Sequence, residues 1–101
     1  MGSGININGY VAPSSILLKS FNNIIYSICY LDDTHIYIGG RFTTPYNYIT
    51  MWNGTSMTQL VNTFNGYVRT IYARSATQVY IGGGFTTPYN YITMWNGTSM
   101  I

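Results

Sequence analysis

Short runs in which side chains alternate with a period of two dominate the chain from residue 14 onward. In the run at 77–85, Val79 and Ile81 point to one face of an extended strand while Tyr80 points to the other. The run at 90–96 has the same pattern, and both of its faces are apolar or aromatic. In a sheet with one face exposed to solvent, apolar and polar residues alternate along each strand. The pattern here therefore predicts strands that are covered on both faces.

The runs are rich in Val, Ile, Thr, Tyr, Phe and Trp, the residues that favour strands. Turn signals separate them, among them Asn65-Gly66, Thr87-Pro88 and Asn96-Gly97. Glycine pairs, proline and the many β-branched residues oppose a helix interior. The sequence therefore predicts an all-β chain with eight strands, near 14–21, 24–31, 34–42, 47–53, 57–64, 67–74, 77–85 and 90–96.

One twenty-residue text occurs twice in the chain. IGGRFTTPYNYITMWNGTSM at 38–57 returns at 81–100 with a single change, Arg41 against Gly84, at a separation of 43 residues. A fixed period of this size is typical of a repeat architecture. Near-identity of the two copies indicates recent duplication or deliberate engineering.

A weaker copy extends upstream of each text. SSILLKSFNN at 14–23 lies one period before MTQLVNTFNG at 57–66, which aligns Leu17 with Leu60. Residues 14–101 therefore form two copies of one unit, each predicted to have four strands. Residues 1–13 are a leader outside the repeat, and its first four letters, MGSG, are typical of a sequence added for expression.

The second unit resembles a blade of the Kelch-like β-propeller repeats. VRTIYARSATQVYIGGGFTTPYNYITMWNG has an inner strand, a second strand that ends in Gly-Gly and an aromatic residue, and a third strand with an aromatic residue before an Asn-Gly turn. The resemblance covers residues 14–101. It implies a ring of roughly four to eight four-stranded blades around a central channel, used mostly as a binding scaffold.

Two blades cannot close such a ring, so the resemblance predicts self-assembly. The blade at 67–96 lacks an outer strand, while the N-terminal strand at 14–21 lacks a sheet to join. Head-to-tail association would let that strand complete the last blade of the neighbouring chain, and a heterologous interface of this kind closes a ring if the rotation divides a full turn. We expect a homotrimer with six blades, common among Kelch-like proteins, with a homotetramer of eight blades as the alternative.

The charge and hydropathy of the chain argue against two classes of partner, nucleic acids and membranes. Only 6% of the residues are charged, the net charge is +2, and the basic residues are scattered, whereas nucleic-acid binding needs clustered Lys and Arg. No apolar stretch approaches the ~20 residues of a membrane helix, and the N-terminus has no secretion signal. We predict neither a nucleic-acid partner nor a membrane partner; the location stays unknown, and is cytoplasmic if the chain is expressed as it stands.

Catalytic and metal-binding chemistry has few candidate residues. The single histidine, His35, follows Asp32 and Asp33 in a predicted turn, and the second unit replaces this turn with Ser-Ala-Thr-Gln at 75–78. One histidine, one cysteine and two adjacent acids cannot build a nucleophilic triad or a multi-ligand metal site within the chain. We predict a solvated turn, and a protein that is not an enzyme and has no cofactor and no metal.

The glycine pairs at 39–40 and 82–83 are followed by no phosphate-binding pattern. A glycine inside a strand is typical of a β-bulge or of a close approach by another backbone. The sequence leaves both interpretations open.

Repeated aromatic residues are the candidate ligand contacts. Trp52 and Trp95 could form platforms for sugar rings, or could instead fill the space between blades. Tyr46 and Tyr89 follow prolines in predicted turns and could be exposed. The sequence predicts a self-assembling propeller scaffold with a structural role; the alternative is a lectin-like glycan- or protein-binding propeller that uses loop or inter-blade pockets.

Overall fold

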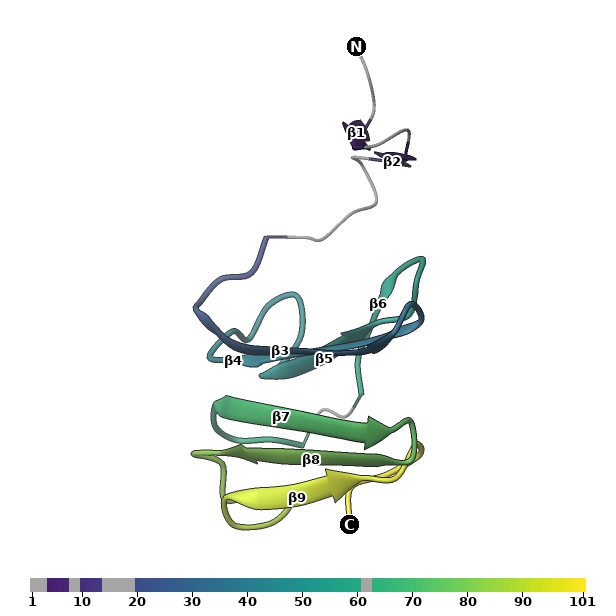
Figure 1. Ribbon diagram of the computed structural model, residues 1–101. Coiled ribbons are helices and arrows are strands. Elements are labelled where there is room, and N and C mark those ends of the chain that lie inside the picture. Colours follow the sequence, from purple (N-terminus) through teal and green to yellow (C-terminus); the bar gives the residue numbers. More distant parts are fainter. Residues whose placement is uncertain (1–3, 8–9, 14–19, 61–62) are drawn as a thin grey trace.

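The computed structural model describes residues 4–7, 10–13, 20–60 and 63–101 (Figure 1). For residues 4–7 and 10–13 it describes the strands alone, and for the other residues it also describes the burial and contacts of the side chains. The described residues contain strands and turns and no helix, so the all-β expectation is confirmed. The strands form an N-terminal hairpin and two further antiparallel sheets, which we call the first and second sheets. Among the described residues, no helix has the length and apolar character to cross a membrane.

The two larger sheets are meanders whose strand order follows the chain. The first sheet contains β3 (Ile25–Asp32), β4 (His35–Gly40), β5 (Ile49–Trp52) and β6 (Met57–Thr58). The second sheet contains β7 (Val68–Ser75), β8 (Gln78–Gly83) and β9 (Ile92–Trp95). Six of the predicted strands are confirmed within a few residues. The strand predicted at 57–64 is limited to β6, and most of the strand predicted at 14–21 lies outside the described residues.

The N-terminal hairpin was not predicted. Strands β1 (Gly4–Ile7) and β2 (Tyr10–Pro13) pair antiparallel, with Gly4 opposite Pro13 and Ile7 opposite Tyr10. The sequence does carry a signal for it, because the dipeptide Asn-Gly at 8–9 stands between two short runs that contain alternating apolar residues. The eight predicted strands therefore omit a hairpin within the segment that was predicted as a leader.

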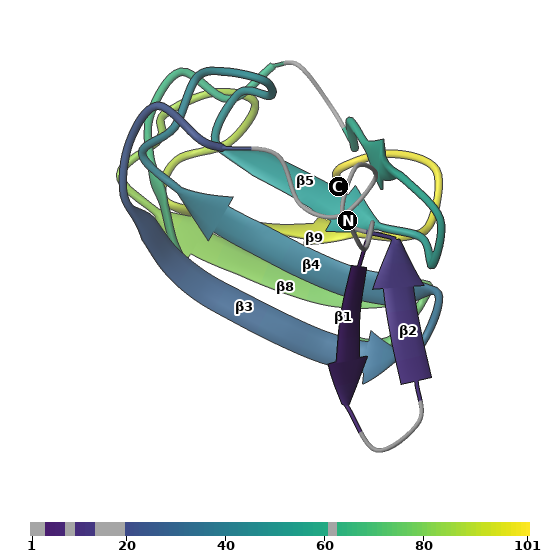
Figure 2. The same cartoon turned by 90° about the horizontal axis from the view of Figure 1, so that it is seen from above.

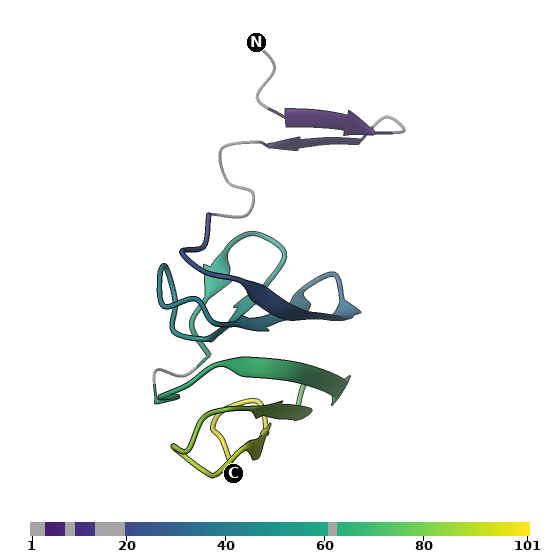
Figure 3. The ribbon, with the colours of Figure 1, turned by 90° about the vertical axis from the view of Figure 1, so that its left-hand side faces the viewer.

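The first and second sheets stack face to face, with β3 and β7 side by side and running in the same direction (Figures 1 and 2). The side view shows the two sheets as separate layers (Figure 3). One apolar cluster lies between them, with its buried side chains contributed by both sheets. They are Tyr37 and Ile49 from the first sheet, and Phe64, Val68, Ile71, Val79, Ile81 and Phe85 from the second sheet and its flanking segments.

The glycine pair of the first sheet serves both purposes that the sequence left open. A Cβ atom on Gly39 would lie 2.4 Å from Cγ1 of Val68, so this glycine permits the close approach of the second sheet. A Cβ atom on Gly40 would lie 2.2 Å from the carbonyl oxygen of Ile24, within the same sheet. The pairing of β3 with β4 shifts register at this point, so the second glycine accommodates a bulge.

Asn22 and Asn65, which precede β3 and β7, form hydrogen bonds with the loops that follow the two glycine pairs. The Oδ1 atom of Asn65 accepts hydrogen bonds from the amides of Thr86 and Thr87 at 2.8 and 3.2 Å. Its Nδ2 atom donates to the Thr86 hydroxyl at 2.8 Å. Asn22 makes the same three contacts one period earlier. These bonds satisfy turn amides that no strand pairs, and they fix the loops identically in both units.

Phe21 and Phe64 stand directly before these asparagines. They pack against Phe42 and Phe85, the phenylalanines that follow the two glycine pairs. The rings of Phe64 and Phe85 lie 4.4 Å apart, and so do those of Phe21 and Phe42. Phe21 is the last residue of the predicted strand at 14–21, and it contacts a ring of its own chain. The end of that segment therefore packs against the first sheet of the same molecule.

The close approach at Gly39 gives a prediction for stability. We expect Gly39→Ala to lower the free energy of unfolding by about 1–3 kcal/mol, because the new methyl group overlaps Val68. Val68→Ala alone removes buried methyl groups and should also destabilise. The double variant should lose less stability than the two single variants added together, because the smaller side chain at 68 makes room for the new methyl group. Denaturant unfolding at a fixed protein concentration measures the free energy of unfolding of the wild type, both single variants and the double variant. Strict additivity would contradict this account of the glycine.

Candidate functional site

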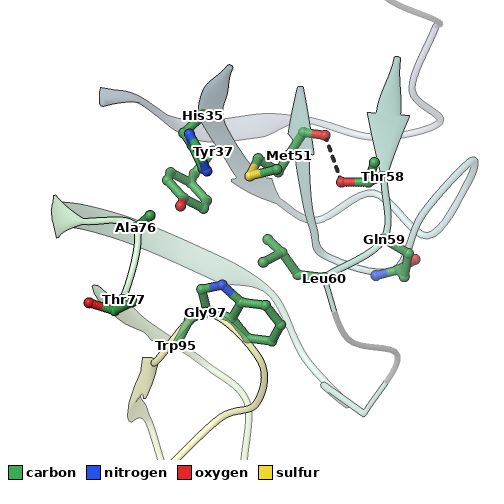
Figure 4. A pocket seen from close by; sticks show the side chains of 10 residues that line it. All are labelled: His35, Tyr37, Met51, Thr58, Gln59, Leu60, Ala76, Thr77, Trp95 and Gly97. Atoms are coloured by element: carbon green, nitrogen blue, oxygen red, sulfur yellow. Dashed lines mark hydrogen bonds between the residues drawn. The ribbon is translucent and has the colours of Figure 1, made fainter. Parts of the chain in front are cut away.

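A cavity of about 320 Å³ opens between the first and second sheets (Figure 4). It lies near the turns that join β3 to β4 and β7 to β8, and its lining is more apolar than polar. The first sheet and the segment after it contribute His35, Tyr37, Met51, Thr58, Gln59 and Leu60; the second sheet and its turns contribute Ala76, Thr77, Trp95 and Gly97.

Tyr37 is the most unusual residue of this lining. Its side chain is 0% exposed, and its buried hydroxyl has no hydrogen-bond partner among the described residues. Figure 4 shows the hydroxyl end directed across the gap toward Ala76 of the second sheet. Burial, and then the charge of Asp32, raises the pKa of Tyr37, so the hydroxyl stays protonated and available as a donor. An unsatisfied buried hydroxyl costs about 1–3 kcal/mol. Because this side chain is 0% exposed, a ligand in the cavity does not reach the hydroxyl in this conformation.

Several other polar groups of the lining are engaged in the sheet itself. The Thr58 hydroxyl donates to the Met51 carbonyl at 3.2 Å, and Nε2 of Gln59 donates to the Ile49 carbonyl at 3.1 Å. These bonds hold the segment that carries Leu60 against β5. Leu60 is thereby placed at the cavity, where it also packs against the apolar cluster.

His35 belongs to an exposed turn at the rim. Its Nδ1 atom lies 2.9 Å from Oδ1 of Asp32, which also accepts the Thr34 amide at 2.9 Å. The His35 contact, followed by the Thr34 amide, lowers the pKa of Asp32. The His35 and Asp32 side chains are 32% and 54% exposed, so the turn is solvated. Within the described part of the chain, no three His, Cys, Asp or Glu residues come together as metal ligands.

The structure brings one of the four predicted aromatic residues to the cavity. Trp95 lines it and packs against the apolar cluster. Trp52 is half-buried on β5 opposite Met57 and is not part of the lining. Tyr46 is half-buried and donates its hydroxyl to the Met57 carbonyl at 3.1 Å, whereas Tyr89 is 48% exposed. The two prolines that precede these tyrosines are cis.

Sequence reasoning missed Tyr37, Met51 and Leu60. The period of two places Tyr37 on the same face of β4 as Gly39, and Met51 lies opposite Tyr37 on β5, but only the structure shows that the second sheet approaches this face. The position of Leu60 depends on the path of the segment after β6, for which the sequence holds no comparable signal.

Comparisons with known proteins add no assignment to this site. The chain matches no family model, no curated protein and no solved structure. The function therefore has to be inferred from the chemistry and the exposure of the residues described above.

The turn at the rim gives a pH prediction. Because the folded-state pKa of Asp32 is depressed, its carboxylate stabilises the turn above the usual value of 3.8, and this contribution is lost as the pH falls through the lower folded-state value. An NMR titration should show the Thr34 amide shift with a midpoint below 3.8. Asp32→Asn should abolish this titration, and Asp33→Asn should leave it. A midpoint at or above 3.8 would contradict the geometry of the turn.

Proposed function

We propose that this protein is a self-assembling β-propeller scaffold whose chains associate head to tail through the outward faces of the first and second sheets. Its role is structural: the assembled ring presents repeated surfaces. The observation that carries the proposal is that equivalent residues of the two units are buried between the sheets in one unit and exposed in the other.

The outward face of the first sheet is one half of this contact. On β3, Ile25 is 40% exposed, Ile28 is 63% exposed and Tyr30 is 62% exposed. One period later the corresponding residues of β7 face the first sheet, and Val68 and Ile71 are 0% and 7% exposed. The face of β3 therefore has the same strand position and apolar character as a face that is covered in the second unit.

The outward face of the second sheet is the other half. Tyr80 and Ile92 are 38% and 65% exposed, while their equivalents in the first unit, Tyr37 and Ile49, are both 0% exposed. Tyr72 is 64% exposed, and its equivalent, Cys29, packs against the apolar cluster. Leaving such large apolar side chains in water forgoes roughly 1.5–3 kcal/mol for each one that could be fully buried.

A second copy of the chain fits these faces better than an unrelated partner does. The contact between the sheets within one molecule already shows how a β8–β9 face and a β3 face would meet, because it joins their equivalents. Gly82 is equivalent to Gly39, and the nearest atoms to a Cβ placed there belong to its own sheet, so the glycine that permits close approach is free on that face. Arg74 on β7 and Asp33 after β3 lie at the same ends of the inner strands, and their opposite charges favour head-to-tail over head-to-head contact.

Repeating one head-to-tail contact generates a ring. We propose a homotrimer with six blades, in keeping with the Kelch-like resemblance, and a homotetramer with eight blades as the alternative. The N-terminal segment at 14–21 would continue the outer strand of the neighbouring second sheet, while Phe21 at its end stays against Phe42 of its own chain. Within one chain, Trp95 forms an isolated bridge with Met100 at the position where Trp52 pairs with Met57, so the chain's own last residues lie where this outer strand would begin.

The heterologous contact can be tested with two charge variants. Ile28→Asp and Ile92→Asp each place a charge on a different exposed face, so each chain should fold but fail to assemble. An equimolar mixture should form a dimer, because the intact face of one variant complements the intact face of the other. Native mass spectrometry and sedimentation measure the species, with the wild-type chain expected as a closed trimer.

Thr55→Asp is the matched control, since it adds the same charge in an exposed turn between β5 and β6. This variant should assemble like the wild-type chain. If either face variant alone still forms the wild-type oligomer, or if the wild-type chain is a monomer, the proposed contact is wrong.

Gly82→Ala gives an independent test. Inside the chain its methyl group would approach Cγ2 of Thr70 to 3.2 Å, a contact that a small shift relieves. At the proposed contact it would meet the neighbouring β3 as a methyl on Gly39 meets Val68. We expect weaker association, by about tenfold or more in the dissociation constant, with the fold of the chain retained by circular dichroism. Unchanged association would show that Gly82 does not lie in the interface.

A further inference from the structure

The strands β3 and β7, which lie side by side, each contain a β-bulge at the same position. The register shift in β3 leaves Tyr26 without a partner residue on β4, and the shift in β7 leaves Arg69 without one on β8. These two residues are 43 positions apart, so they are equivalent residues of the two units. The extra residue of a bulge leaves the alternation of its strand, so neither side chain is assigned to one face of its sheet.

The two bulge residues contact each other across the sheets. The Cζ atom of Arg69 lies 4.6 Å from the centre of the Tyr26 ring, within the range of a cation–π interaction. In the part of the chain that the structure describes, Arg69 forms no ion pair, so aromatic rings are the partners of its charge. Arg69 is exposed and Tyr26 is half-buried, so both keep accessible surface for a second contact.

The other members of this aromatic cluster do not repeat between the units. The Tyr67 ring lies 5.6 Å from Cζ of Arg69 and 5.2 Å from Cζ of Arg41. The equivalents of Tyr67 and Arg41 in the other unit are Ile24 and Gly84, which have neither an aromatic ring nor a charge. A junction between two copies would join these equivalents, so Tyr67 and Arg41 act within one chain.

The bulge pair, in contrast, is complementary at both kinds of junction. Within the chain the contact joins one position of the first unit to the same position of the second unit. A head-to-tail junction joins the second unit of one chain to the first unit of the next, and therefore brings Arg69 to Tyr26 again. Resting on the assembly proposed above, we infer that Arg69 of each chain stacks on Tyr26 of the next chain, so that the two residues alternate around the closed ring.

This alternation favours the head-to-tail arrangement. A contact between two first sheets would bring only Tyr26 to the junction, and a contact between two second sheets would bring only Arg69. Neither offers a cation and a ring together, and the second places like charges on the same interface, which is unfavourable. The pair thus gives the interface a polarity that the apolar side chains of the two faces do not supply.

The mixed dimer of the Ile28→Asp and Ile92→Asp chains isolates the junction contact, because it contains a single junction. The Ile28→Asp chain contributes Arg69 to that junction, and the Ile92→Asp chain contributes Tyr26. Arg69→Met in the Ile28→Asp chain removes the junction contact. The same substitution in the Ile92→Asp chain removes only an internal contact, and is therefore the matched control.

Sedimentation measures the dissociation constant of each mixed dimer, and circular dichroism checks that each chain is folded. We expect Arg69→Met to weaken the dimer about fivefold in the Ile28→Asp chain and less than about twofold in the Ile92→Asp chain. Tyr26→Leu should have the opposite dependence, weakening the dimer only when it is placed in the Ile92→Asp chain.

Exchanging the two residues tests the alternation in the full assembly. Tyr26→Arg alone places two arginines side by side at every junction, and this chain should dissociate at concentrations where the wild-type chain is assembled. Adding Arg69→Tyr restores one cation and one ring to each junction. Native mass spectrometry should then detect the wild-type oligomer again. A doubly substituted chain that associates no better than the Tyr26→Arg chain would contradict the alternation.

The mixed dimers also separate this contact from the assembly on which it depends. If the Ile28→Asp and Ile92→Asp chains form no dimer, the head-to-tail assembly is wrong, and the stacking between chains is wrong with it. If that dimer forms but Arg69→Met weakens it equally in both placements, or in neither, the assembly stands and the stacking of Arg69 on the next chain is overturned.

Discussion

The close approach of two sheets at Gly39 is the constraint on which the rest of the structure depends. Because this residue has no side chain, Val68 and Ile71 can lie directly against β4. Their burial defines which face of each sheet is the inside, and hence which tyrosines and isoleucines are covered. The cavity lies between the same two sheets, near the turns that carry His35 and Ala76.

The two near-identical segments at 38–57 and 81–100 show that the burial of a residue is not determined by the sequence around it. Ile49 and Ile92 occupy the same position in the same strand, yet one is 0% and the other 65% exposed. Their strand register, glycine bulge and asparagine-fastened loop are equivalent, so the difference arises from the neighbouring sheet alone. A sequence that places large apolar side chains at both positions is suited to a neighbour on each side, which is the physical basis for proposing association.

The fold was predictable to the extent that it rests on local patterns. Alternation of side chains and turn dipeptides located six strands of the two large sheets within a few residues. The glycine pairs indicated a bulge or a close approach, and the pair in the first sheet shows both. The hairpin before residue 14 was missed although the Asn-Gly dipeptide at 8–9 indicated it. The site was less predictable, because Tyr37, Met51 and Leu60 meet Trp95 only after two sheets have stacked, and no local pattern encodes that juxtaposition.

Two of the positions at which the two units differ lie at the cavity between the sheets. His35 is replaced by Gln78 in the second unit, and Ala76 corresponds to Asp33 in the first, whereas the shared text supplies the frame of Tyr37 and Trp95. If copies associate head to tail, the new junction would place Gln78 and Asp33 where the internal junction has His35 and Ala76. A ring built in this way would alternate two chemically different cavities, one neutral and one with an acidic group at its rim. The differences at these two rims leave unchanged the glycine pair and the repeated segment on which the stacking at both kinds of junction depends.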